Sequence, residues 1–256
     1  MRNPITDIMK KHRSIRQFEE RPIPKGLVEE LVSCGQRAST SSNLQAYSVI
    51  EVSDPIKKKE LAKLCADQKQ VHQSASFLVF CADLHRNRLA GMIHDAEYFD
   101  GDYVEALLIA TVDAALILQN VALAAESHDL GVCMIGAIRN HPKAVGSLLN
   151  LPSFVYAVAG LCLGYPAVDP KCKPRLPLGT ILHKEHYPED ADQLKHMKDY
   201  NQTMIDFYKS QQMHERDPRW TKVMASRTAK FHDRVELDAF LTDQGFRLRS
   251  DPTQLE

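Results

Sequence analysis

The sequence lacks the features that mark several large classes of protein. Its six cysteines form no CxxC pair, so it indicates neither a thiolate metal site nor a disulfide framework. The formal net charge at pH 7 is only -1, and we therefore expect neither nucleic acid nor a membrane as a partner. The N-terminal segment carries charges throughout and lacks the apolar core of a signal peptide, which predicts a cytoplasmic protein.

No internal repeat or low-complexity tract interrupts the 256 residues. This length suits one large domain or two small ones. With 44% hydrophobic and 25% charged residues, the composition argues against disorder. His183 and His186 lie in a polar linker without a matched third ligand, so we expect no metal centre.

The longest apolar segment, residues 104–126, predicts a core helix. It carries Asp113 at its middle, where a charge in a membrane would cost on the order of 3 kcal/mol. One face of this helix carries only small side chains, because alanine recurs every fourth residue at Ala106, Ala110 and Ala114. Another helix can approach closely along this face. This face could form a subunit interface or pack within one subunit, and the sequence leaves both open.

A first helix is predicted to begin at Pro4 with Asn3 as its N-cap. Residues at helical spacing predict a buried stripe on it. The stripe comprises Ile5, Ile8, Met9 and His12, with Arg16 one turn later.

Residues 12–16 read His-Arg-Ser-Ile-Arg and form a dense cluster of hydrogen-bond donors. Two arginines, a histidine and a hydroxyl can chelate a phosphate with charge-assisted bonds. The alternative is a satisfied core histidine, with arginines that pair with Glu19 and Glu20. On this pentapeptide alone the two interpretations are evenly balanced.

Further segments suggest binding, each with a plainer alternative. Residues 39–43 form a hydroxyl-rich loop, which composition alone favours as a turn. Gly136 after a short strand lets backbone approach a ligand, although such a glycine more often marks only a turn. Lys173 and Arg175, two residues apart in a Pro-rich stretch, can form a second anion clamp or belong to a solvated linker. A basic stretch at 209–234 could receive a phosphate, although such runs are more often solvated helix faces.

Periodicity and capping residues predict the remaining elements. Strands are predicted at 47–52, 77–82, 132–135 and 154–164, and helices at 25–35, 54–65, 142–151, 190–211 and 220–241.

Taken in order along the chain, these stretches resemble the FMN-dependent nitroreductase family, in particular its larger NADPH-preferring branch of oxygen-insensitive nitroreductases and flavin reductases. The resemblance covers nearly the whole chain. Its motifs are residues 12–16, the Ser-rich loop into Leu44-Gln45, Gln68-Lys69, 80–83, Asp113 with Gln119-Asn120, 124–127, 135–140, and 160–166 through 173–177. The sequence departs from close relatives at Ala137, often a second glycine there, and at Cys133-Met134, where an aromatic residue is frequent.

The resemblance implies an α+β nitroreductase-like fold, with a central, mainly antiparallel sheet flanked by helices. Residues 1–180 would form the FMN-binding core. Residues 181–256 would form a C-terminal helical arm of the same domain, carrying the dimer arm and an NADPH-binding loop. Two chains would intertwine as a homodimer.

The resemblance also implies a set of FMN-binding residues. The phosphate and ribityl chain would be bound by the two cationic clusters, and the isoalloxazine ring by Gln68 and the backbone of 135–137, where an N–H can bond flavin N5. Ser41 and the stretch at Leu44 would come from the other subunit. The full set is His12, Arg13, Ser14, Arg16, Ser41, Leu44, Gln45, Gln68, Ile135, Gly136, Ala137, Lys173 and Arg175.

NADPH, the implied co-substrate, would place its 2'-phosphate on the loop between the last helices, at His214, Arg216, Arg219 and Arg227. Because the flavin carries the electrons, no protein nucleophile or metal is needed. Nitroaromatics, quinones, azo compounds or free flavin would be reduced in a ping-pong cycle. Two alternatives remain: a non-catalytic FMN carrier or sensor, and a flavin enzyme of this fold that does not use NAD(P)H directly.

Overall fold

The computed structural model describes residues 3–96, 99, 101–212, 217–230 and 234–246. The chain divides into two compact units: residues 1–170 together with 234–256, and residues 171–233. We call the first the core unit and the second the excursion unit. The division of function at residue 180 stays a prediction.

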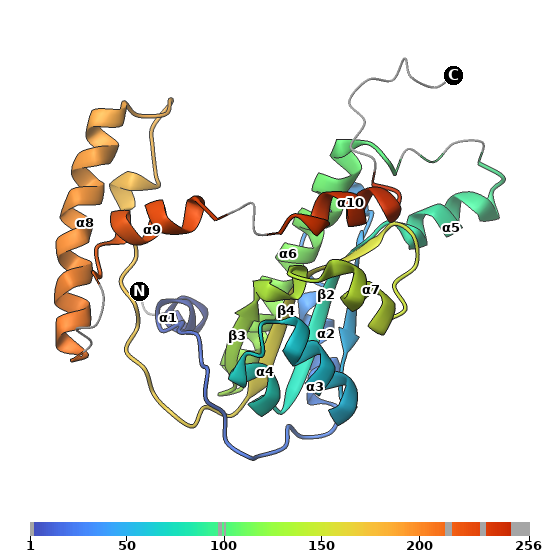
Figure 1. The fold of residues 1–256 in the computed structure, drawn as a ribbon, viewed down its shortest axis with the longest axis horizontal. Helices are drawn as coiled ribbons and strands as arrows, with labels where there is room; N and C mark the ends of the chain where they lie inside the picture. Colours follow the sequence, from blue (N-terminus) through green and yellow to red (C-terminus); the bar gives the residue numbers. More distant parts are fainter. Residues whose placement is uncertain (1–2, 97–98, 100, 213–216, 231–233, 247–256) are drawn as a thin grey trace. The chain divides into compact units, whose positions relative to one another are not determined.

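The core unit is built on a four-stranded antiparallel sheet with the strand order β1-β2-β4-β3 (Figure 1). Each predicted strand is present within one residue at either end. The strands are β1 (Tyr47–Glu51), β2 (Ser76–Asp83), β3 (Gly131–Ile135) and β4 (Val155–Gly164). Every residue of β2 and β4 is buried, as expected for central strands covered on both faces.

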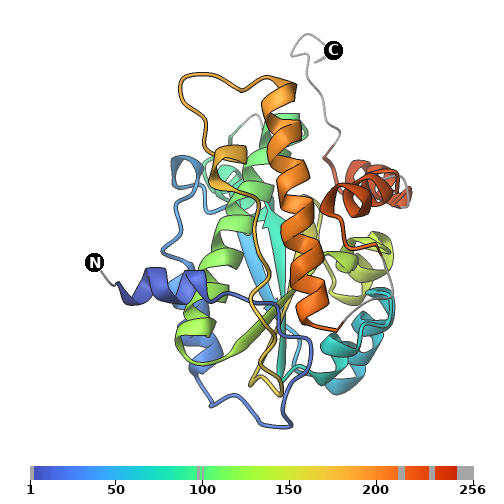
Figure 2. The same ribbon diagram turned by 90° about the vertical axis from the view of Figure 1, so that its left-hand side faces the viewer.

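Alternate side chains of β2 enter two separate cores, because successive residues of a strand point to opposite faces. Leu78 and Phe80 pack with α2 (Leu27–Gly35) and α6 (Val104–Ser127). Phe77 and Val79 lie in the second core. That core also takes in α3 (Pro55–Leu64), α4 (Lys69–Gln73) and α7 (Pro142–Leu148). Helices therefore cover both faces of the sheet (Figure 2).

The alanine face of α6 packs within the chain. Ala110 and Ala114 are fully buried in the first core. On α2, a Cβ added to Gly35 would lie 2.4 Å from Val121 Cγ2 and 3.0 Å from Ile117 Cγ1, so the two helices approach closely. Of the two interpretations of the alanines, close packing within one subunit is confirmed.

Helix α6 is long and apolar enough to cross a membrane by length and composition. Its buried face includes Asp113, which is 1% exposed. The predicted core helix is thus confirmed within one residue at its C-terminal end.

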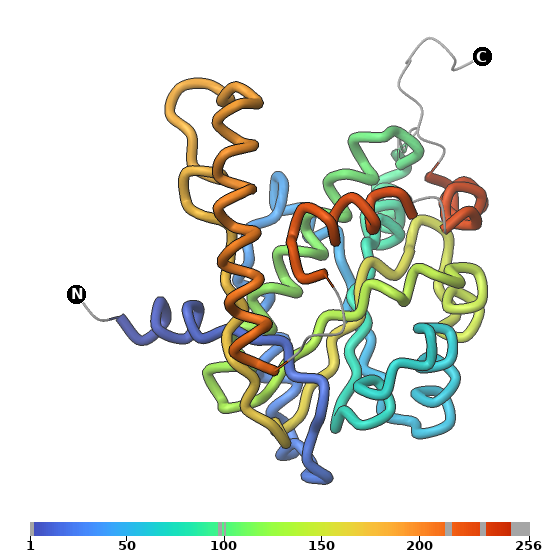
Figure 3. The backbone as a smooth tube through the Cα atoms, turned by 60° about the vertical axis from the view of Figure 1, so that its left-hand side comes forward, coloured from blue at the N-terminus to red at the C-terminus, as the bar shows by residue number. Residues whose placement is uncertain are grey.

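The prediction for the first helix was partly wrong. Helix α1 (Pro4–Lys10) begins as expected, with the Asn3 side chain accepting a hydrogen bond from the Ile5 N–H. It ends before His12, and none of its residues is buried; Ile5 is 56% exposed. The helix ends because the chain from residue 14 pairs with β3 as an extended segment (Figure 3).

The helix predicted at 220–241 is two helices. Helix α9 (Trp220–Thr228) belongs to the excursion unit, whereas α10 (Glu236–Asp243) belongs to the core unit. Burial of Phe240 and Leu241 in the first core holds α10 there. Helical periodicity alone did not reveal this separation, since no proline or glycine interrupts the segment. The predicted helix before it is present as α8 (Asp190–Ser210).

Helix α4 was not predicted from the sequence, and neither were four further short elements. They are the helix α5 (His85–Ile93) and the 3-10 turns η1 (Ser41–Asn43), η2 (Gly136–Arg139) and η3 (Leu178–Thr180). Two of these turns, η1 and η2, lie in the predicted flavin-binding segments.

Candidate functional site

The cationic cluster at residues 12–16 lies beside the edge strand β3. The N–H of Ile15 donates to the Val132 carbonyl at 2.9 Å, and Ser14 forms a parallel bridge to Val132. Ile15 is buried, with its side chain against the backbone of Gly131. Because neighbours in an extended segment point to opposite sides, Ser14 and Arg16 direct their side chains away from this core.

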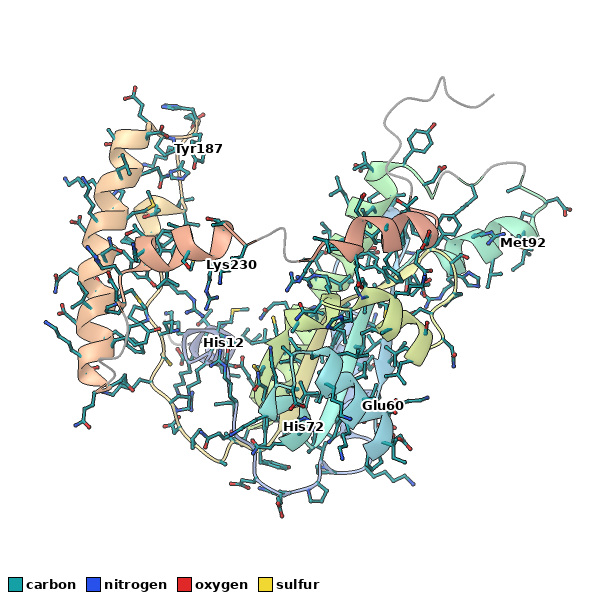
Figure 4. The ribbon with its side chains drawn as sticks, viewed as in Figure 1. His12, Glu60, His72, Met92, Tyr187 and Lys230 are labelled. Carbon is teal, nitrogen blue, oxygen red and sulfur yellow. The ribbon has the colours of Figure 1, made fainter. Side chains whose placement is uncertain are left out.

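His12 is held by an acidic residue from the last turn of α6. His12 is labelled in Figure 4, close to α1. Its Nδ1 lies 2.7 Å from Glu126 Oε1, and the side chains are 29% and 13% exposed respectively. A carboxylate accepts hydrogen bonds, so Nδ1 carries the proton and Nε2 is left for another partner. The sequence motif at 124–127 contained Glu126, but its role in orienting the imidazole was missed.

Arg13 is only partly committed to protein partners. Its guanidinium pairs with Asp169 and donates to the Lys11 carbonyl at 3.0 Å. Within the described part of the chain, its Nε atom is buried and has no hydrogen-bond partner. An unpaired buried donor of this kind is costly, and a bound anion would satisfy it.

A hollow of about 490 Å³ opens beside Arg16. It is lined by Arg16, Gln17, Phe18, Lys69, Gln70, Gln73 and Ala167. Gln68, predicted to contact the flavin ring, precedes α4 and accepts a hydrogen bond from Gln70 Nε2 at 2.6 Å. The exposed face of α4 thus lines the hollow beside Arg16. The sequence motifs alone did not indicate this contribution of α4.

Residues 135–137 form the transition from β3 to η2, as the glycine suggested. Ile135 is buried, whereas Gly136 and Ala137 are partly exposed. The preceding Cys133 is buried, which raises the pKa of its thiol, and the positive charge of Arg16 opposes this shift. Arg16 therefore lies close enough to β3 to act on it electrostatically.

The hydroxyl-rich loop is more than a simple turn. Both carboxylate oxygens of the buried Asp113 accept backbone N–H bonds at 3.1 Å, from Ser41 and Ala46. Ser42, Asn43 and Gln45 all have positive φ values, between 47° and 57°. Such conformations are strained in residues other than glycine and persist only when surrounding contacts enforce them.

Helix α5 binds the same loop from its carbonyl side. Arg86 donates to the carbonyls of Gln45 and Tyr47, each at 3.2 Å, and Asn87 donates to the Leu44 carbonyl at 3.1 Å. Leu44 itself remains 37% exposed. The loop is therefore fixed on both sides while it presents Leu44 outward.

In the excursion unit, the second cationic cluster lines a hollow of about 910 Å³. Lys173, Arg175 and Arg227 lie on its wall together with the aromatic residues Tyr200 and Trp220. The Tyr200 hydroxyl donates to the Pro174 carbonyl at 2.7 Å and anchors the segment. Lys173 and Arg175 thus line one cavity, together with Pro174 between them and Leu176 after them.

The predicted 2'-phosphate residues differ in their surroundings. Arg219 pairs with Asp217, and this guanidinium holds the pKa of the carboxyl down at about 2. Arg227 lines the large hollow. His214 and Arg216 lie outside the described residues.

Comparison with known proteins identifies the family. The profile of the Nitroreductase family matches residues 9–165, and that of the Nitroreductase family, C-terminal domain, matches residues 173–249. The chain belongs to the nitroreductase family. The resemblance seen in its motifs is confirmed, and so is the α+β fold with a mainly antiparallel sheet.

Nitroreductase relatives match the chain over almost its full length. It is 37% identical to the FMN reductase (NADPH) of Bacillus subtilis, over 96% of this chain and 99% of the relative. It is 36% identical to a CR(VI) reductase of Pseudomonas sp., over 94% and 98% respectively. The solved structure of NfrA1 from B. megaterium superposes with a TM-score of 0.92 at 36% identity, covering 96% of this chain and 100% of that one.

Proposed function

We propose that this nitroreductase is an FMN-dependent oxidoreductase that takes hydride from NADPH and reduces small planar acceptors in a ping-pong cycle. Relatives named FMN reductase (NADPH) and NADPH-flavin oxidoreductase, the latter from Vibrio harveyi, share 37% and 36% of their residues with it. FMN is its cofactor and NADPH its co-substrate. Nitroaromatics, quinones, azo compounds and free flavin are the acceptor classes that suit such chemistry, and the cytoplasm is its proposed location.

The observation that carries the proposal is the course of residues 12–16 along β3 toward the turn at Gly136. The donors of this segment suit a phosphate. Arg13 Nε is buried and has no partner among the described residues, and only the Nδ1 nitrogen of His12 is paired with a carboxylate there. Polar backbone at the end of an edge strand suits a flavin ring. When bound, FMN supplies the hydride-accepting and hydride-donating chemistry.

The FMN-binding residues in this proposal are those that the family resemblance implies. The phosphate and ribityl chain are bound by His12, Arg13, Ser14, Arg16, Lys173 and Arg175, and the ring by Gln68, Ile135, Gly136 and Ala137. Within the core unit, residues 17–19 pair with 165–167, so the segment after the first cluster lies beside the segment that follows β4. Lys173 follows Asp169, the partner of Arg13, by four residues in the sequence.

For NADPH, the proposed 2'-phosphate residues are His214, Arg216, Arg219 and Arg227. Arg227 has the clearest structural support for this role, since it lines the same hollow as Lys173. Arg219 would have to share its guanidinium between Asp217 and a phosphate. An Arg227→Ala substitution should therefore raise the KM for NADPH more strongly than that for NADH, as steady-state kinetics with both nucleotides would reveal.

A homodimer completes the proposal. Helix α6 exposes an apolar stripe at Val104, Leu108, Val112 and Leu116, each between 40% and 54% exposed. A stripe at four-residue spacing forms one helix face, and burying it against a second copy is favourable. The loop with Ser41, Leu44 and Gln45 would then contribute to the site of the other subunit.

Visible absorption spectroscopy tests the proposal directly. The purified protein is recorded anaerobically before NADPH, after NADPH, and after a quinone or nitroaromatic. We expect flavin bands that bleach with NADPH and return with the acceptor. Bands that persist with NADPH would instead favour a carrier or an enzyme supplied by another reductant, and a protein that cannot be loaded with FMN would contradict the proposal.

A further inference from the structure

Two arginine side chains lie beside Gly136, the first residue of η2. A Cβ built on Gly136 would lie 3.5 Å from a guanidinium nitrogen of Arg139 and 4.0 Å from one of Arg234. Among the described residues, neither guanidinium pairs with a carboxylate. Positive charge is thus concentrated beside η2, and no described acidic residue forms an ion pair with it.

Arg234 bridges both ends of the turn. One terminal nitrogen donates to the Gly136 carbonyl at 3.2 Å, and its Nε donates to Asn140 Oδ1 at 3.2 Å. Arg234 lies two residues before the start of α10, whose Phe240 packs against Gly146 of α7. Its backbone is therefore anchored to the core, and the guanidinium is aimed at η2.

Arg139 sits deeper and is held by the sheet. Its guanidinium donates to the Val158 carbonyl on β4. Val158 is an extra residue in the pairing with β2, because Phe80 lies opposite Ala159 and the next residue opposite Ala157. Burial lowers the pKa of Arg139, and the neighbouring charge of Arg234 lowers it further. Two adjacent cations repel each other, so the fold maintains an arrangement that favours negative charge nearby.

We propose that Arg234 is a positioning residue that orients and polarises the Gly136–Ala137 peptide and thereby stabilises the reduced form of bound FMN. This inference rests on the proposed function, which places the flavin ring against residues 135–137. The Gly136 carbonyl and the Ala137 N–H belong to one peptide group, so a cation bonded to the carbonyl strengthens the N–H as a donor. Hydride transfer from NADPH adds two electrons and one proton to the ring, leaving a negative charge that fixed positive charge favours.

The test is the midpoint potential of bound FMN, measured by anaerobic titration of the holoprotein with a redox dye. Arg234→Gln keeps a hydrogen-bond donor but removes the charge, whereas Arg234→Lys keeps the charge. Arg37→Gln is the matched control, because it removes the same charge from an exposed position after α2. We expect the Arg234→Gln protein to bind reduced FMN about tenfold less tightly relative to oxidised FMN. For a two-electron couple this corresponds to a fall of about 30 mV in the midpoint potential. Arg234→Lys should recover most of this fall, and Arg37→Gln should match the unaltered protein.

Two results would overturn the inference. One is an unchanged potential in an Arg234→Gln protein that is folded by circular dichroism and holds FMN. The other is an equal fall in Arg37→Gln, which would show an effect of net charge alone. If Arg234→Gln does not retain FMN, Asn140→Leu is measured instead. This substitution removes the second acceptor that orients the Arg234 guanidinium, so it should also lower the midpoint potential. An unchanged potential in this variant would overturn the inference.

Failure of the proposed function gives a different result. An unaltered protein that binds no FMN, or whose flavin bands persist with NADPH, would contradict the oxidoreductase itself. A protein that binds FMN and bleaches with NADPH, but whose potential is insensitive to Arg234, would contradict only this inference.

Discussion

Glu126 contacts His12 Nδ1 at 2.7 Å and is itself mostly buried. Glu126→Ala would leave Nδ1 unpaired and the imidazole free to rotate. Because an orienting hydrogen bond contributes about 0.5–1.5 kcal/mol, we expect FMN to bind up to about tenfold more weakly. Fluorescence quenching during FMN titration of the apoprotein measures this change.

Glu126→Gln is the matched control for this prediction, because the amide oxygen still accepts from Nδ1. Its FMN affinity should remain near that of the unaltered protein. Equal weakening in both variants would show that the negative charge, rather than the orientation of His12, matters at this position.

Asp113 is the residue on which the loop at 41–46 depends. Each of its oxygens accepts a backbone N–H, and asparagine can offer only one acceptor at the same place. Asp113→Asn should therefore lower the free energy of unfolding by about 1–3 kcal/mol. Urea denaturation provides the measurement, with the exposed Glu105→Gln on the same helix as the control; a comparable loss in both would contradict this account.

At the scale of helices, the contact between α2 and α6 depends on the absence of a side chain at Gly35. An added methyl group would meet Val121 and Ile117, both fully buried. Overpacking of this kind costs about 1–3 kcal/mol, so Gly35→Ala should lower the free energy of unfolding. Thermal denaturation would measure the loss.

Gly91 in α5 offers the opposite case. A methyl group there would lie 3.5 Å from Ala96 Cβ, an ordinary contact. Gly91→Ala should raise the free energy of unfolding by about 0.5–1 kcal/mol, because alanine favours the helix. Stabilisation by both substitutions would show that α2 can shift away from α6.

At the scale of the whole molecule, the apolar stripe of α6 predicts self-association. Leu108→Asp together with Val112→Asp places two charges on the stripe, and burying unpaired charge is costly. We expect sedimentation to show a shift from dimer to monomer. The flavin absorbance of the purified variant should show that it retains less FMN. Ile93→Asp, at a position 77% exposed on α5, is the control and should leave the mass unchanged; a doubly substituted protein that stays dimeric would place the interface elsewhere.

Local signals predicted most elements because their causes are local. Asn3 and Asp54 do cap their helices with side-chain oxygens. The β-branched run at 47–52 and the continuous apolar runs at 77–82 and 154–164 did form strands. The misses have longer-range causes: α1 ends early because residue 14 pairs with β3, and the helix predicted at 220–241 is divided because Phe240 is buried in the core unit. For the candidate site, the ordered motifs predict which segments contribute, but they do not reveal the contacts that Glu126, Arg86 and Arg234 make with those segments.

The sequence by itself determined the family, the order of the strands and helices along the chain, and the residue types available to an anion and a flavin. Periodicity, capping residues and motif order are properties of neighbouring residues, and they can be recognised without coordinates. Only the tertiary structure decided which donors are already committed and which remain available. Hydrogen-bond partners such as His12 and Glu126 lie far apart in the sequence, and their pairing depends on how the sheet and helices pack.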